Sequence, residues 1–157
     1  MHCNYNSNYK YNQNSEIMRE IRYRGIGIAE RKWVFGSLWF DTRNKATLIW
    51  SEELKYWVRV DPATVGQYTG LKDEHGKEIY EGDVIRSPLS EDKTRPHRIF
   101  YHTGNAAFMG ALVDRKELCY LRLDQDWIYK FGKEVIGNIH DNPELIEKQT
   151  AERHKTN

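Results

Sequence analysis

The stretch VGQYTGLKDEHGKEIYEGDVI, residues 65–85, decides the fold of this chain more than any other segment. Four glycines punctuate it, and glycine serves where the backbone needs positive φ or an approach that a Cβ would obstruct. Its polar centre has the composition of a tight loop, with Asp73 placed to hydrogen-bond its own downstream backbone. Neither spacing of a nucleotide-phosphate loop, G-x-x-x-x-G-K-S/T or G-x-G-x-x-G, is present. We therefore interpret the glycines as structural turn residues of a β protein: Gly66, Gly70, Gly76 and Gly82.

Short apolar runs on both sides of this segment predict a mainly β protein. Residues 33–40 are apolar at nearly every position, which fits a strand covered on both faces or an aromatic surface for a partner. Residues 54–60 are expected to form one strand whose alternate side chains, beginning with Leu54, point one way. Residues 127–131 are predicted as a strand, and Pro143 is predicted to start a short C-terminal helix. The other expected strands are 46–50, 99–101, 106–113, 118–123 and 135–139.

Three blocks of the sequence resemble the YopX family of phage and prophage proteins. They are MREIRYRG at residues 18–25, QYTGLKDEHGKEIYEGDVI at 67–85 and EVIGNIHDNPEL at 134–145, and their order and spacing match that family. The resemblance covers residues 18–146. It implies a largely β protein, encoded by phages, prophages or other mobile elements, whose C-terminal part is a small SH3-like barrel. It brings no catalytic residues with it.

These blocks divide the chain into four expected parts. Residues 1–17 form a flexible N-terminal extension, 18–68 an N-terminal β subdomain, 69–146 an SH3-like barrel of YopX type and 147–157 a frayed tail. The extension is rich in Asn, Tyr and Ser and lacks the apolar core of a secretory signal. Translation from Met18 and an ordinary disordered N-terminus are both compatible with it. Whether the two β parts share one core stays open at this point.

The composition describes a globular protein with a polar surface. Among 157 residues, 30% are charged and 13% aromatic, and the formal net charge is +1. This balance excludes a general electrostatic attraction for nucleic acid or acidic membranes. Only Cys3 and Cys119 are present, too few for a disulfide framework, and no apolar run approaches the length of a membrane span. A reduced cytoplasm fits best, and no membrane partner is expected.

The residues that could carry chemistry do not form a catalytic or metal-binding signature. The histidines lack the helical spacing and the cysteine support of a metal site, so we expect solvated loop side chains at His75, His97, His102 and His140. Carboxylates beside glycines are usual in turns, which weakens acid–base or divalent-cation roles for Asp73, Glu74, Glu78, Glu81 and Asp83. Cys119 is expected to be a buried, inert thiol. No catalytic residue, metal or cofactor is predicted, and the chain is expected not to be an enzyme.

Two binding functions fit the sequence. The favoured one is a protein-interaction module, with self-association as one form, because residues 33–57 carry an excess of aromatic side chains. The alternative is a small β-barrel that binds single-stranded nucleic acid through a basic loop and a ring for base stacking. Its candidate residues are Lys93, Arg95, Arg98 and Tyr101. A metal-dependent enzyme ranks behind both.

Overall fold

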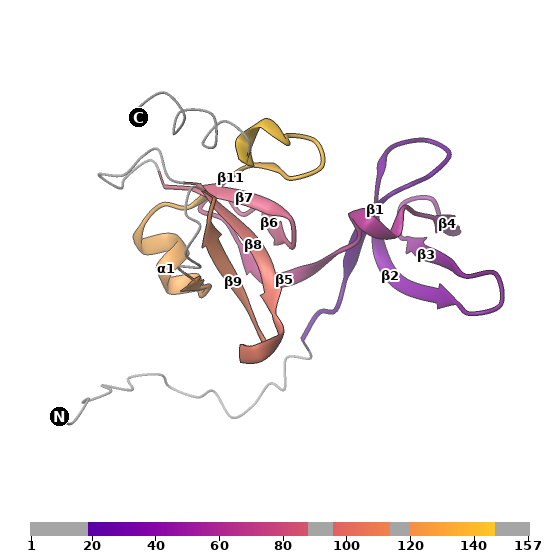
Figure 1. The fold of residues 1–157 in the computed structure, drawn as a ribbon, viewed down its shortest axis with the longest axis horizontal. Helices are drawn as coiled ribbons and strands as arrows, with labels where there is room; N and C mark the ends of the chain where they lie inside the picture. The colour runs from indigo at the N-terminus through magenta and orange to yellow at the C-terminus, as the bar shows by residue number, and fades with distance from the viewer. Residues whose placement is uncertain (1–18, 88–95, 114–119, 147–157) are drawn as a thin grey trace, which may run out of the picture.

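A computed structural model of the protein describes residues 19–87, 96–113 and 120–146 (Figure 1). These residues form eleven strands, the helix α1 and two 3₁₀ turns, which confirms the prediction of a mainly β protein. The first strands are β1 (Tyr23–Ile26), β2 (Trp33–Asp41), β3 (Ala46–Ser51), β4 (Trp57–Arg59), β5 (Gly66–Lys72) and β6 (Glu78–Tyr80). The later elements are β7 (Asp83–Arg86), β8 (His97–His102), β9 (Ala107–Leu112), β10 (Tyr120–Arg122), α1 (Gln125–Lys130) and β11 (Glu134–Asn138).

The strands form two antiparallel sheets. One has the order β4-β3-β2-β1-β5-β6 and the other the order β10-β9-β8-β7-β11. Strands β1 to β4 lie on one side of the molecule and β6 to β11 with α1 on the other, while β5 runs between them (Figure 1). Neither sheet closes into a barrel within the described ranges, so the SH3-like barrel expected for residues 69–146 is not confirmed.

A small apolar core holds the N-terminal strands together. Val34, Ile49 and Val60 are buried in it, on the inner face of β1 to β4. A bridge between Gly27 and Val60 ties the chain after β4 back to the end of β1. Because side chains alternate along a strand, the residues between the core positions point outward. This alternation determines which aromatic residues are left exposed.

A second core lies in the C-terminal sheet, and helix α1 covers it. Ile128 of α1 is fully buried there with Ile79 and Ile85. The prediction of a strand over residues 127–131 is therefore wrong. A carboxylate oxygen of Asp124 accepts a hydrogen bond from the Trp127 amide at 2.8 Å, which satisfies an amide that a helix start leaves unpaired.

The strand predicted over residues 54–60 is also wrong in its first half. The Ser51 amide donates a hydrogen bond to the Tyr56 carbonyl at 3.0 Å, and Lys55 has a φ of 61°. The chain therefore turns between these residues before β4 begins. The other predicted strands are confirmed where they are described, and 118–123 is seen as the shorter β10. Residues 144–146 are helical, in line with the expected short C-terminal helix.

Residues 65–85 contact both sheets. β5 pairs with β1 and with β6, and β7 follows in the second sheet. A Cβ on Gly66 would lie 2.6 Å from the Glu81 carbonyl oxygen, so the close approach of the two backbones requires glycine there. Gly82 has a φ of 81°. Its amide donates a hydrogen bond to the Ile99 carbonyl, and its carbonyl accepts one from the Ile139 amide. The turn glycines Gly70 and Gly76 also have positive φ, 85° and 82°.

Candidate functional site

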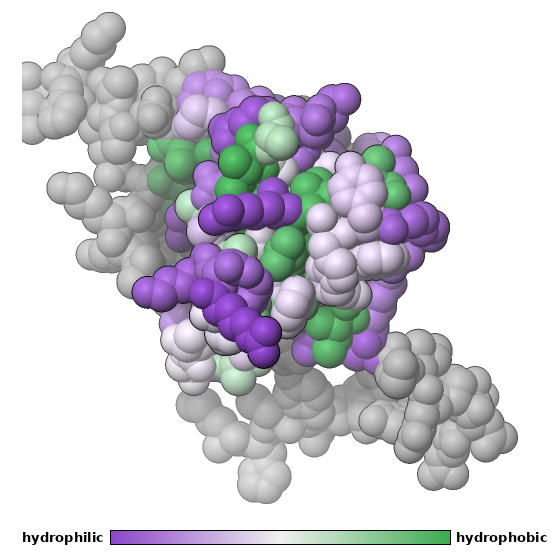
Figure 2. Space-filling model, turned by 90° about the vertical axis from the view of Figure 1, so that its right-hand side faces the viewer, coloured by the Kyte–Doolittle hydropathy of each residue, from purple (hydrophilic) through white to green (hydrophobic). Residues whose placement is uncertain are grey.

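Exposed apolar side chains gather on the N-terminal strands. The described residues include eleven exposed large hydrophobic side chains, and seven of them lie between residues 28 and 57. Figure 2 views the end of the molecule that these strands form and shows hydrophobic and intermediate residues gathered on it. Exposed apolar side chains gathered in one part of a soluble protein are typical of an interaction site. The seven are Ile28, Phe35, Trp39, Phe40, Leu54, Tyr56 and Trp57.

Three tryptophans form the outer face of this sheet. The register places Trp50 opposite Trp57 and opposite Ser37, and Trp39 follows Ser37 on the same side of β2. The Trp57 ring lies 5.5 Å from that of Trp39 and 5.6 Å from that of Trp50 between centroids. Trp39 is 51% exposed and Trp57 42%. We call Trp39, Trp50 and Trp57 the tryptophan face.

A pocket of about 380 Å³ opens beside the tryptophan face. Its apolar lining includes Val34, Leu54, Tyr56 and Val58, and its acidic lining consists of Glu30, Glu52 and Glu53. Val58 alternates with Trp57 along β4, so the pocket reaches the side of β4 opposite the tryptophan face. We call it the acid-rimmed pocket.

A buried ion pair joins the N-terminal sheet to β7. Arg24 donates to a carboxylate oxygen of Asp83 at 2.6 Å, and its guanidinium lies over the Trp33 and Tyr80 rings at 4.7 and 4.9 Å. Burial raises the pKa of Asp83 above its usual value, although Arg24 acts in the opposite direction. The Trp33 indole also donates to Asp141 at 2.7 Å. These contacts link the two sheets. The charges of Arg24 and Asp83 are paired with each other and therefore have a structural role.

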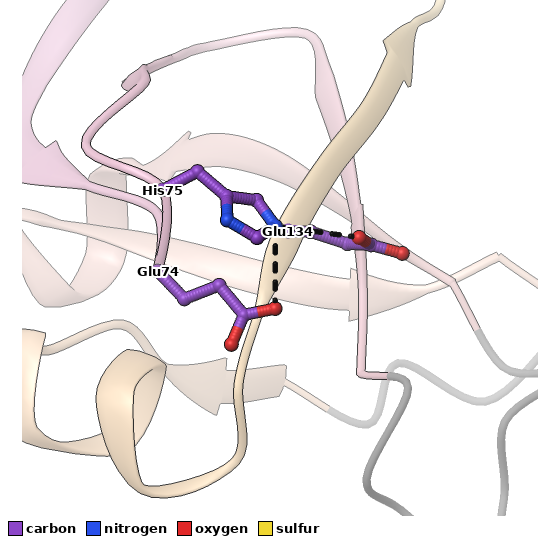
Figure 3. Close-up of side chains that lie close together, drawn as sticks. All are labelled: Glu74, His75 and Glu134. Carbon is purple, nitrogen blue, oxygen red and sulfur yellow. Dashed lines mark ion pairs between the residues drawn. The ribbon is translucent and has the colours of Figure 1, made fainter.

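One cluster of potential metal ligands is present among the described residues (Figure 3). His75 Nε2 lies 3.5 Å from Glu74 Oε1 and 3.8 Å from Glu134 Oε2. One imidazole and two carboxylates suit a divalent cation. However, Arg86 pairs with Glu134 at 2.9 Å, and the His75 side chain is 68% exposed. Ion pairing at the surface therefore accounts for the cluster.

The contact between His75 and Glu134 was not predicted from the sequence. The two residues come from the β5–β6 turn and from β11, and no spacing along the chain indicates that they meet. The link is Asp73, whose buried carboxylate accepts hydrogen bonds from the amides of His75, Lys77 and Val135. The downstream bonding expected for Asp73 is thus present, together with a contact to β11 that the sequence does not reveal.

The nucleic-acid candidates are not brought together by the described structure. Arg98 and Tyr101 are three residues apart on β8, so they project from opposite faces of that strand. The Arg98 guanidinium lies 5.9 Å from the Phe100 ring, while the Tyr101 ring packs against Phe108 at 5.4 Å. Lys93, Arg95 and Cys119 lie outside the described residues.

The chain is similar to a known protein family and to a solved structure. The family model described as YopX protein matches residues 3–147. The crystal structure of protein EF1440 from Enterococcus faecalis is similar, with a TM-score of 0.53 and 26% sequence identity over 81% of this chain and 98% of that chain. No curated protein matches the chain. None of the helices in the described ranges is long and apolar enough to cross a membrane.

Proposed function

The chain belongs to the YopX family, as its three sequence blocks predicted, and from this premise we propose that it acts by binding another protein. The binding surface is the tryptophan face on β2, β3 and β4, and self-association is one form of this function. The observation that carries the proposal is the exposure of Trp39 and Trp57, whose rings contact one another at the surface. Tryptophan is enriched among residues that dominate binding energy in protein interfaces.

Covering these rings is expected to contribute a substantial part of the binding free energy. Full burial of a large apolar side chain contributes about 1.5–3 kcal/mol, so the exposed halves of two tryptophans supply about 2 kcal/mol together. That corresponds to about a thirtyfold change in affinity. The rings also pack against one another before binding, so less side-chain freedom is lost when a partner covers them.

A non-enzymatic role is part of the proposal. Two titratable groups whose pKa burial shifts have structural contacts: Asp83 pairs with Arg24, and the Lys133 ammonium lies 4.4 Å from the centre of the Trp127 ring. Burial lowers the pKa of Lys133, but the ring is the contact its ammonium makes. These partners support a role in folding for both groups.

Three finer expectations from the family resemblance belong to the same proposal. They are an origin in phages or other mobile elements, a relationship of the C-terminal sheet to SH3-like folds, and a cytoplasmic location. They are consistent with a small binding protein that acts inside an infected cell. The nucleic-acid alternative has less support, because Arg98 and Tyr101 face opposite ways on β8.

Affinity capture with matched variants tests the proposed function. The wild-type protein, a Trp39→Ser/Trp57→Ser variant and an Ile21→Ser/Tyr129→Ser control are immobilised and exposed to a host lysate. The control removes two exposed hydrophobic side chains outside the tryptophan face. Proteins retained by the wild type and the control but lost by the tryptophan variant are the expected result. Light scattering over a concentration series identifies self-association in the same way.

The proposal fails if the tryptophan variant retains the same proteins and the same oligomeric state as the wild type. Circular dichroism of each variant establishes that the fold is intact, because loss of the ring contacts costs some stability. A folded tryptophan variant with unchanged binding would show that this face is not the interaction surface.

A further inference from the structure

The acid-rimmed pocket points to the chemistry of the partner. We propose that it binds a segment of the partner protein in which a bulky apolar side chain is flanked by lysine or arginine. This inference rests on the proposed function and adds the class of segment recognised. It uses residues on the side of β4 opposite the tryptophan face.

The apolar lining of the pocket is accessible from outside. Val34 and Val58 line it and also pack in the small N-terminal core. Leu54 and Tyr56 are 45% and 53% exposed beside them. The volume of about 380 Å³ is near the lower end for ligand pockets. It therefore suits one bulky side chain and its backbone better than a large cofactor.

The charges around this lining favour a basic segment. Glu30, Glu52 and Glu53 line the pocket and Lys32 is the one cation among the lining residues. Lys55 contacts Glu52 at 3.6 Å, but both side chains are largely exposed, at 70% and 64%, and such pairs contribute little. The chain as a whole carries a formal charge of +1, so the excess of carboxylates among the lining residues is a local feature.

Charge complementarity of this kind favours one partner over another. Carboxylates around an apolar site attract lysine and arginine and disfavour acidic segments, which changes the association rate and the specificity. β4 is the edge strand of its sheet, and its residue Trp57 belongs to the tryptophan face. A partner that covers this edge can therefore use the tryptophan face for contact area and the pocket for selection.

Labelled peptides test the pocket directly. The probe is a short fluorescein-labelled peptide of alternating lysine and leucine, and fluorescence anisotropy measures its binding to the full chain. Two comparison peptides carry glutamate in place of lysine or serine in place of leucine. We expect the lysine–leucine peptide to bind more tightly than both. Equal binding of the lysine and glutamate peptides would overturn the inference.

Variants of the protein show whether the pocket is the binding site. Glu30→Gln with Glu53→Gln is expected to weaken binding of the lysine–leucine peptide about fivefold and to reduce its dependence on salt. Leu54→Ser is expected to weaken binding without altering the salt dependence. Glu74→Gln with Glu144→Gln removes two carboxylates far along the chain and serves as the control. Equal weakening by the control pair, or none by Glu30→Gln/Glu53→Gln, would contradict the proposed site.

The same assay separates this inference from the proposed function. Trp39→Ser/Trp57→Ser is measured alongside the pocket variants in the peptide and lysate experiments. If captured proteins depend on the tryptophans but not on Glu30, Glu53 or Leu54, the inference fails and the proposed function stands. If the peptide depends on the pocket while lysate capture does not depend on the tryptophans, the proposed function fails and the pocket remains a basic-peptide site.

Discussion

Two polar contacts between individual side chains link the two sheets. Arg24 and Asp83 form a buried pair, and breaking such a pair from one side leaves an uncompensated charge. Trp33 and Asp141 form a second link nearer the surface. Burial raises the pKa of Asp141, but hydrogen bonds from Asn138 and Trp33 outweigh burial and lower it below 3.8.

The Asp141 link predicts a pH-dependent stability. Because its pKa is lower in the folded state, the carboxylate stabilises the protein above about pH 3.8, and this contribution is lost as the pH falls through the folded pKa. Asp141→Asn is expected to reduce the free energy of unfolding by about 0.5–1 kcal/mol at neutral pH. The deficit should disappear in strong acid.

Denaturant unfolding, followed by tryptophan fluorescence at both pH values, measures this difference. Glu144→Gln is the control, because the Glu144 carboxylate accepts a hydrogen bond from Asn142, whereas the Trp33 indole donates to Asp141. A deficit of the same size at neutral and acid pH would mean that the charge of Asp141 does not stabilise the fold.

At the scale of elements, most of the strands were predictable and the helix α1 was not. Residues 127–131 are nearly all apolar or aromatic, and a run this short fits a strand or one helical turn equally well. The deciding signal was Asp124, three residues before Trp127, which is a helix-capping position. The strand prediction for the first half of residues 54–60 was wrong for another reason. Apolar and polar residues alternate well there, but a turn with Lys55 at positive φ interrupts the strand.

The cap at Asp124 makes a prediction about α1. Asp124→Ala is expected to cost about 1 kcal/mol, because a helix of six residues has few bonds of its own and depends on its cap and on the burial of Ile128. Thermal unfolding followed by circular dichroism should show a decrease of about 3 °C. Asp124→Asn keeps an acceptor at the cap and should unfold near the wild-type temperature. Equal destabilisation by both variants would assign the effect to the charge.

At the scale of the whole molecule, the family was predictable from sequence and the binding surface only in part. The aromatic excess of residues 33–57 indicated either burial or a partner surface, and the structure leaves Trp39 and Trp57 exposed. Sequence cannot distinguish these outcomes, because other parts of the chain determine which face of a sheet is covered. The contact of His75 with Glu134 was hidden for the same reason, since it joins segments far apart in sequence.

Charge balance leads to a last prediction, about nucleic acid. With a formal charge of +1 and with Arg98 and Tyr101 on opposite faces of β8, the protein offers no continuous basic and aromatic track within the described residues. A labelled single-stranded oligonucleotide should therefore bind weakly, with the same affinity for the wild type and a Lys93→Ala/Arg95→Ala/Arg98→Ala variant. Tight binding whose logarithmic salt slope falls by about 2 in that variant would mean that up to three phosphate contacts are lost. That result would favour the nucleic-acid function over the protein-binding one, because phosphate contacts and not the tryptophan face would then supply the affinity.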